Sequence, residues 1–294
     1  MTLCVPRKFK KYSRRARMAT CKPCNLSVKK LDSLVIAGGG AKSMAGLGAI
    51  HILRKNGHLK ELKTVAGTSA GAIVATGVAL NRNCVEMCKA FANETYVPSI
   101  DIGNFSNAFG IDTGAHLYRW IDIVLGDRSH TFKSIYDETG ITLIICATNM
   151  STLSAKYFSP TETPDFDVKT AIRMSCSLPI FFSAVRHEGE VYVDGALTDA
   201  FPIDYVNNME TTHNTLGIRY DSAEYSTHKD INSIDKFFTS LVAISTRDKY
   251  SPDSNVMTID VGKITVLDFK NPKVLKKAFK IGASRMSQLL KKIE

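Results

Sequence analysis

One short segment, Val65-Ala-Gly-Thr-Ser-Ala-Gly-Ala72, restricts the fold of this chain more than any other. An apolar run ends at Gly67, and an Ala-rich stretch typical of a helix begins directly after Ser69. This G-x-S-x-G pattern predicts a strand, a sharp turn and a helix, with the Ser69 hydroxyl exposed at the turn. Gly67 and Gly71 have no side chain to collide where strand and helix approach. A helix-capping serine between two glycines gives the same pattern, so other signals must decide.

A second Gly-rich turn precedes this segment. Leu31–Ala37 has the apolar character of a buried strand, and an apolar helical stretch, Met44–Leu53, follows the turn. Backbone N–H groups in such a turn point toward an anion. The spacing fits neither of the two common phosphate-binding patterns, G-x-x-x-x-G-K-[ST] and G-x-G-x-x-G. Because Ser69 lies one β-α-β unit away, the turn suits an oxyanion hole built from the amides of Gly38, Gly39 and Gly40.

A third signal is a carboxylate at the end of a short alternating strand, Glu190–Asp194, followed by Gly195 and Ala196. Catalytic side chains of α/β sheets are commonly placed at strand ends, so Asp194 is a candidate partner for Ser69. An isolated Asp-Gly pair is more often an ordinary turn. The position of Asp194 alone therefore does not decide between the two interpretations.

Further elements are predicted from apolar periodicity. Residues 92–114 are rich in loop-forming residues and are expected to form a lid or a substrate-facing loop. Strands are expected at Ile141–Ala147, Ala155–Ser159, Thr215–Tyr220 and Val256–Val261, and helices at Asn83–Phe91, His116–Leu125, Val168–Met174, Ile231–Thr246 and Pro272–Glu294.

Composition limits the class of protein. With 294 residues, 44% hydrophobic and 22% charged, the chain can bury a large core and is not a disordered protein. The longest apolar run, around residues 64–80, is too short for a membrane span, and no apolar stretch follows the basic N-terminus as in a signal peptide. We therefore expect a cytoplasmic protein that associates peripherally with membranes.

The seven cysteines argue against a disulfide framework, because their number is odd and they are spread over a long chain. Cys21-Lys-Pro-Cys24 resembles half of a zinc site, and Cys84 with Cys88 would have to supply the other half. No second C-x-x-C is present, so no metal is expected.

Positive charge is concentrated at the two ends of the chain. Residues 1–30 contain ten Lys or Arg and no acid, which predicts a flexible basic arm. Residues 271–294 contain seven Lys or Arg and one acid, and the predicted helix there is amphipathic. Such a helix either caps the core or lies in an anionic membrane interface. Its apolar side carries Leu275, Phe279, Met286, Leu290 and Ile293.

Three motifs together resemble the patatin-like phospholipase family in order and spacing. These are Gly38-Gly39-Gly40-Ala-Lys42, Gly67-Thr-Ser69-Ala-Gly71 and Asp194-Gly195-Ala196. The segment Ser175-Cys-Ser-Leu-Pro179 and the position of Pro202 are similar to that family as well, and the resemblance covers roughly Leu34 to Val206. Three positions depart from the family pattern, where glycine, glycine and asparagine are common: Ser43, Ala196 and Ala200.

The resemblance implies a three-layer α/β/α fold with a mostly parallel central sheet. We expect the catalytic core over residues 31–210, with residues 211–294 completing the same domain and ending in the basic amphipathic helix. The implied activity is that of a phospholipase A-type lipid acyl hydrolase that needs no cofactor or metal. Ser69 would be the nucleophile, Asp194 the general base, and the glycine turn the oxyanion hole. Lys42 would lie near the lipid phosphate, or else be a solvated lysine at a helix start.

The implied partner is a phospholipid surface, with anionic lipids favoured by the basic ends; whether a protein activator is needed stays open. One alternative enzyme is an α/β-hydrolase with a Ser-Asp-His triad, since His213 and His228 follow Asp194 in the required order. Another is a lipid transacylase using the same acyl-enzyme. A nucleic-acid-binding protein would fit the formal net charge of +10, but the chain shows no interleaving of aromatic and basic residues. No nucleic-acid partner is therefore expected.

Overall fold

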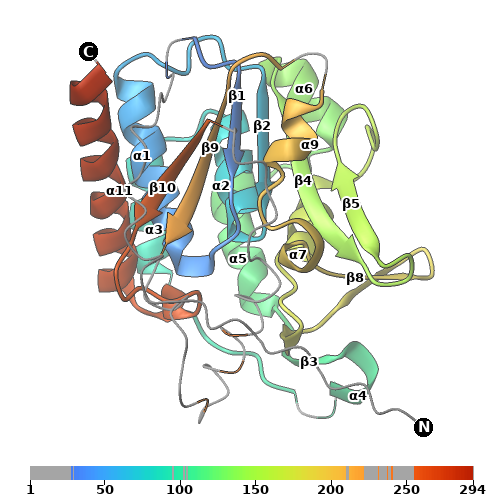
Figure 1. The fold of residues 1–294 in the computed structure, drawn as a ribbon. Helices are drawn as coiled ribbons and strands as arrows, with labels where there is room; N and C mark the ends of the chain where they lie inside the picture. Colours follow the sequence, from blue (N-terminus) through green and yellow to red (C-terminus); the bar gives the residue numbers. More distant parts are fainter. Residues whose placement is uncertain are drawn as a thin grey trace, which may run out of the picture.

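The computed structural model describes residues 28, 30–94, 96–101, 103, 105–209, 212–221, 231, 237, 240 and 255–293 (Figure 1). The basic arm predicted for residues 1–30 and the helix predicted for Ile231–Thr246 lie almost entirely outside these residues. The strands are β1 Ser33–Ile36, β2 Thr64–Thr68, β3 Gly110–Asp112, β4 Thr142–Asn149, β5 Ser154–Phe158, β6 Ile180–Phe182, β7 Val185–His187, β8 Glu190–Asp194, β9 Thr215–Asp221 and β10 Val256–Asp260.

The helices follow the predicted ranges closely, with several short ones added. They are α1 Ser43–Lys55, α2 Ala70–Ala79, α3 Cys84–Asn93, α4 Phe105–Ala108, α5 Ala115–Leu125, α6 Phe132–Thr139, α7 Val168–Ser175, α8 Ala196–Asp199, α9 Ile203–Asn207 and α11 Pro272–Ile293, with 3-10 turns η2 Gly40–Lys42 and η4 Asp268–Lys270.

Within the described residues, eight strands form one sheet in the order β10-β9-β1-β2-β4-β8-β7, with β5 also paired to β4. The strands from β10 to β4 run parallel, whereas β5, β7 and β8 pair antiparallel to their neighbours. The parallel strands β1 and β2 are buried along their whole length, which agrees with their content of apolar and small residues and their lack of charged ones.

Helices cover both faces of this sheet. Helix α2 packs against β1, β2 and β4, and α9 packs against β1 and β9. In Figure 1, α9 lies in front of the sheet and α2 lies behind it. The predicted three-layer α/β/α fold with a mostly parallel sheet is therefore confirmed.

The C-terminal helix α11 packs on α1 and α3, and its apolar side faces the core. Leu275, Met286 and Leu290 are buried. The backbones meet so closely that a Cβ atom on Gly282 would overlap the carbonyl oxygen of Ala45. The core-capping interpretation of this segment is the one the structure supports. Within the described part of the chain, none of the helices is long and apolar enough to cross a bilayer.

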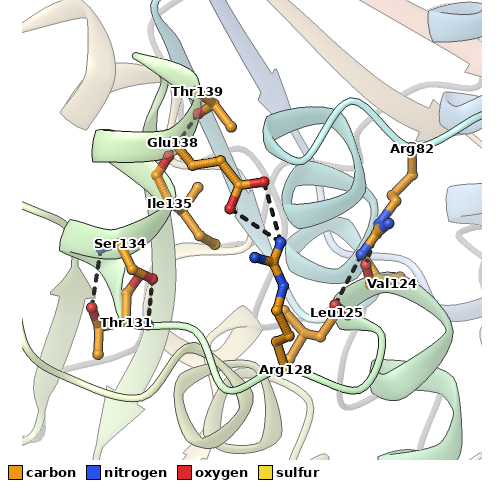
Figure 2. Close-up of polar contacts among 9 residues, drawn as sticks. All are labelled: Arg82, Val124, Leu125, Arg128, Thr131, Ser134, Ile135, Glu138 and Thr139. Carbon is orange, nitrogen blue, oxygen red and sulfur yellow. Dashed lines mark hydrogen bonds and ion pairs between the residues drawn. The ribbon is translucent and has the colours of Figure 1, made fainter.

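Helix α6 was not predicted, although its start carries a recognisable signal. Thr131 and Ser134 form a reciprocal capping box at its N-terminus (Figure 2). Arg82 closes the last turn of the preceding helix, α5, by donating to the carbonyl oxygens of Val124 at 2.8 Å and Leu125 at 2.9 Å. The two contacts fix both ends of the α5–α6 connection.

Residues 92–114, expected to be loop-rich, contain the short elements α4 and β3. Strand β3 pairs in parallel with β6, and Ile100 forms an antiparallel bridge with Asp112. In Figure 1, β3 and α4 lie beyond the lower end of the sheet, the end toward which β9 points. The segment is therefore a small substructure at the carboxyl end of the parallel strands.

Candidate active site

The G-x-S-x-G segment forms the predicted strand, turn and helix. Strand β2 ends at Thr68, α2 begins at Ala70, and Ser69 between them has φ 56° and ψ −133°. This conformation is strained for a residue with a side chain, and it points the hydroxyl away from both elements. A Cβ atom on Gly71 would lie 2.5 Å from the carbonyl oxygen of Ile36, and one on Gly67 would overlap the Gly71 carbonyl. The steric role expected for both glycines is found.

Ser69 and Asp194 are in direct contact. The Ser69 hydroxyl donates to Oδ2 of Asp194 at 2.6 Å. The contact arises because β4 lies between β2 and β8, so that the ends of β2 and β8 meet at one edge of the sheet. The second carboxylate oxygen, Oδ1, accepts the N–H of Ala196 at 2.9 Å. A Cβ atom on Gly195 would overlap the Cys146 carbonyl, so this turn requires a glycine.

The environment of Asp194 sets its protonation. The side chain is 3% exposed, and burial raises its pKa from 3.8 to about 6. The hydrogen bonds from Ser69 and from the Ala196 amide act in the opposite direction, because they stabilise the charged form. Asp194 is therefore mostly ionised at neutral pH and is a stronger base than a solvated aspartate, as general-base chemistry requires.

The end of α7 holds both residues. The Ser69 N–H donates to Oγ of Ser175 at 2.8 Å, and Ser175 Oγ donates to the Cys146 carbonyl at 2.6 Å. Two residues later, the Ser177 carbonyl accepts the N–H of Asp194 at 2.9 Å. The family resemblance includes this segment, but the sequence patterns predict no role for Ser175 or Ser177. Polar residues between a helix end and Pro179 were the available signal.

The triple-glycine turn lies against Ser69. A Cβ atom on Gly38 would lie 3.4 Å from the Cβ atom of Ser69. The Gly38 N–H, however, donates to the Ala200 carbonyl at 2.9 Å. Of the three amides expected to bind the oxyanion, the Gly38 amide is therefore already occupied. Within the described residues, no protein acceptor is found for the N–H groups of Gly39 and Gly40. Gly40 has φ +52°, and a side chain there would collide with the Val266 carbonyl.

Lys42 is not the solvated lysine that was one of the two expectations. Its side chain is 0% exposed, and a position near a lipid phosphate stays a prediction. Ser43, where the family commonly has glycine, is also fully buried. Both residues lie where η2 runs into α1, within the packed core.

The predicted alternative with His213 in a triad is wrong. The His213 N–H donates to Asp32 Oδ2 at 3.0 Å, just before β9 begins. Strand β9 runs parallel to β1, and β1 runs parallel to β2, whereas Ser69 follows the carboxyl end of β2. At about 3.3 Å per residue, the five residues of β2 separate the two ends by about 17 Å. His228 lies outside the described residues.

Of the four cysteines suggested for a metal site, the structure describes only two. Cys84 and Cys88 are buried free thiols, and burial raises the pKa of each. Cys21 and Cys24 lie outside the described residues. In the part of the chain that the structure covers, no three His, Cys, Asp or Glu side chains are grouped so that they could hold a metal ion.

Comparisons with known proteins agree with this architecture. Among curated relatives, the uncharacterized protein R571 of Acanthamoeba polyphaga mimivirus is 27% identical over 245 residues, which are 79% of this chain and 82% of that protein. The probable lipid hydrolase 463L of Invertebrate iridescent virus 6 is 23% identical over 257 residues, covering 83% and 88%.

Among solved structures, VipD from Legionella pneumophila is similar in fold, with a TM-score of 0.55 and 18% identity over 90% of this chain and 67% of VipD. A family model for patatin-like phospholipase matches residues 34–207, which is more than half of the chain. This chain therefore belongs to the patatin-like phospholipase family.

Proposed function

We propose that this protein is a lipid acyl hydrolase that cleaves acyl esters of glycerophospholipids through Ser69 and Asp194. Family membership and the naming of one relative as a probable lipid hydrolase support hydrolysis of lipid esters. The observation that carries the finer assignment is the 2.6 Å hydrogen bond from the Ser69 hydroxyl to a buried carboxylate. A carboxylate in this position can accept the hydroxyl proton without a histidine.

In the first half-reaction, Asp194 takes the proton as Ser69 Oγ forms a bond to the ester carbonyl carbon. The carbonyl oxygen becomes an oxyanion, and the Gly39 and Gly40 amides are the donors we assign to it, because the Gly38 amide is already bonded. The intermediate then collapses, the bond to the lysophospholipid oxygen breaks, and that oxygen takes the proton from Asp194. An acyl-enzyme on Ser69 remains.

In the second half-reaction, Asp194 accepts a proton from water as the water oxygen attacks the acyl carbon. Collapse of this intermediate breaks the bond to Ser69 Oγ, which recovers its proton from Asp194, and the fatty acid leaves. A lipid alcohol in place of water would give transacylation by the same steps. Nothing in the described site favours one acceptor over the other, so hydrolysis is proposed on the basis of the family.

The test is lipid product analysis by mass spectrometry, with purified protein on mixed phospholipids and neutral glycerides. We expect free fatty acid and lysophospholipid from the wild type, and none from Ser69→Ala or Asp194→Asn. His213→Ala and His228→Ala serve as matched controls and should retain activity within a few-fold. If His228→Ala lowered the activity about a thousandfold, the enzyme would use a Ser-Asp-His triad and not a dyad. Transfer of the acyl group to an added lipid alcohol in preference to water would make the protein a transacylase.

A further inference from the structure

Residues 97–109 expose several large apolar side chains at the carboxyl end of the sheet. Val97 and Ile100 are each 62% exposed, Phe109 is 50% exposed and Phe105 is 44% exposed. Scattered exposed apolar residues are ordinary, but four within thirteen residues mark a candidate interaction surface. We call the described residues among 97–109, which leave out 102 and 104, the apolar segment.

The apolar segment is connected to the candidate site through the backbone. The Phe109 carbonyl accepts the N–H of Ile180 at 3.2 Å, and the Ala108 carbonyl accepts the N–H of Ala184 at 2.8 Å. Ile180 begins β6, three residues after Ser177, whose carbonyl holds the Asp194 amide. Backbone hydrogen bonds therefore join the apolar segment to the stretch of chain that holds the Asp194 amide.

Two exposed cations flank the segment and lie over aromatic rings. The Arg186 guanidinium is 5.4 Å from the ring centre of Phe109, and its Nη2 donates to the Asn107 carbonyl. Next to the start of the segment, Lys270 Nζ is 5.4 Å from the ring centre of Tyr96, and it is 5.7 Å from that of Phe181. Aromatic and aliphatic side chains with cations beside them match a lipid interface, where acyl chains lie below anionic phosphates.

Helix α11, one of the two basic ends expected to favour anionic lipids, lacks a free apolar side. The apolar side of α11 packs on α1 and α3, so this helix can offer a bilayer mainly its lysines. A stable anchor to a membrane needs buried apolar area as well as charge. The apolar segment supplies such area at the carboxyl end of the sheet, where the exposed side chains of Met150 and Leu153 in the β4–β5 turn lie as well.

We propose that the apolar segment, with Arg186 and Lys270 at its edges, is the surface by which this protein docks on anionic phospholipid. The proposal deepens the proposed function, on which it rests for the identity of the substrate, because docking there presents lipid esters to Ser69. Side chains of the apolar segment enter the acyl region, and the two cations contact lipid phosphates.

The experiment measures binding of the full chain to vesicles of phosphatidylcholine, with and without phosphatidylglycerol, by co-sedimentation. Each protein carries Ser69→Ala, so that the lipid is not consumed. The test variant is Val97→Ser/Ile100→Ser/Phe105→Ser, which changes exposed side chains only. Its affinity for the anionic vesicles should fall at least about tenfold, given the apolar area removed.

The matched control is Tyr136→Ser/Ile293→Ser, which removes apolar side chains that are 46% and 37% exposed. These lie on α6 and at the end of α11, at the opposite end of the sheet from α4 (Figure 1). The control should bind as the parent does. The proposal would be overturned if the test variant bound the anionic vesicles as tightly as the parent does, or if the control lost as much affinity as the test variant. It would also be overturned if the parent bound vesicles without phosphatidylglycerol as tightly as vesicles that contain it.

A second readout separates this proposal from the proposed function. With Ser69 restored, the test variant should hydrolyse a short, water-soluble ester at the wild-type rate and lose activity only on vesicles. If the wild type cleaves no ester at all, the proposed function fails, whereas the binding experiment on the Ser69→Ala proteins still tests the docking surface. Loss of soluble-ester hydrolysis in the test variant would show that the segment acts on the site itself, against the proposal.

Discussion

Asp194→Asn should make the folded protein more stable at neutral pH while it removes the proposed base. The wild-type carboxylate is 3% exposed, and its burial raises the pKa from 3.8 to about 6. A shift of about two units, at about 1.4 kcal/mol per unit, means that ionised Asp194 lowers the free energy of unfolding by about 3 kcal/mol at pH 7.5. Asparagine avoids this penalty because it is neutral.

The effect has a definite dependence on pH. Below pH 3.8 the folded and unfolded chains both bind the proton, so the group causes no penalty there. As pH rises toward 6, the unfolded chain loses the proton first and the folded protein becomes relatively less stable. The advantage of Asp194→Asn should therefore decrease from about 3 kcal/mol at pH 7.5 to roughly half of that at pH 5.

Asparagine can keep both contacts of the carboxylate. Its oxygen can accept the Ala196 N–H, and its amide can donate to Ser69 Oγ in place of the present bond. Urea unfolding of wild type and variant at the two pH values measures the difference. Asp137→Asn, at an exposed ion pair with Lys133, should change the stability by less than about 0.5 kcal/mol. A variant no more stable than wild type at pH 7.5, or an advantage that does not shrink at pH 5, would refute the reasoning.

Four further predictions concern the same site and the packing of helix α11 on α1. The kcat/KM for a soluble ester should fall about tenfold per pH unit below an apparent pKa of about 6, measured as a pH–rate profile, since Asp194 must be ionised. Ser69→Gly should be about 1 kcal/mol more stable than Ser69→Ala in urea unfolding, because φ 56° with ψ −133° is strained for alanine. Ser175→Ala should lower kcat about tenfold or more with KM little changed, and Ser175→Thr should restore it, because only a hydroxyl accepts the Ser69 N–H. Gly282→Leu should lower the thermal midpoint by separating α11 from Ala45 of α1.

Local patterns predicted the nucleophile region well. The strand, the turn at Ser69 and the helix after it depend on residues next to one another, and the two glycines are required by contacts within a few residues or with the neighbouring strand. Parallel strands buried on both faces also have an unmistakable apolar sequence. For such segments, the sequence and the structure agree within a few residues.

The partner of Ser69 could not be found from local pattern alone. An Asp-Gly pair is usually a turn, and Asp194 meets Ser69 only because β8 pairs antiparallel to β4 across the sheet. The family resemblance supplied that long-range information. Burial of Lys42, the bond from Gly38 to the Ala200 carbonyl and the position of His213 likewise depend on residues distant in the chain. Periodicity reports none of these contacts.

The short elements near the site were missed for a related reason. Strands β3 and β6 have three residues each, too few for a pattern with period two. Phe109 and Ile180, which meet through a backbone hydrogen bond, have positive φ values of 60° and 68°. Sequence rules reserve such conformations for glycine and asparagine. In the small β3–β6 sheet, tertiary packing therefore overrides the backbone conformations that Phe109 and Ile180 would prefer.

The site combines two features that oppose folding: a strained backbone at Ser69 and a buried charge at Asp194. Each needs restraints from outside its own turn, and one segment supplies a restraint to both, since Ser175 holds the Ser69 amide and Ser177 holds the Asp194 amide. Asp194 has further restraints, because β8 pairs with β4 and the hydroxyl of Thr148 donates to the Asp194 carbonyl at 2.9 Å. Substitutions at Ser175 should therefore disturb the position of Ser69 more than that of Asp194.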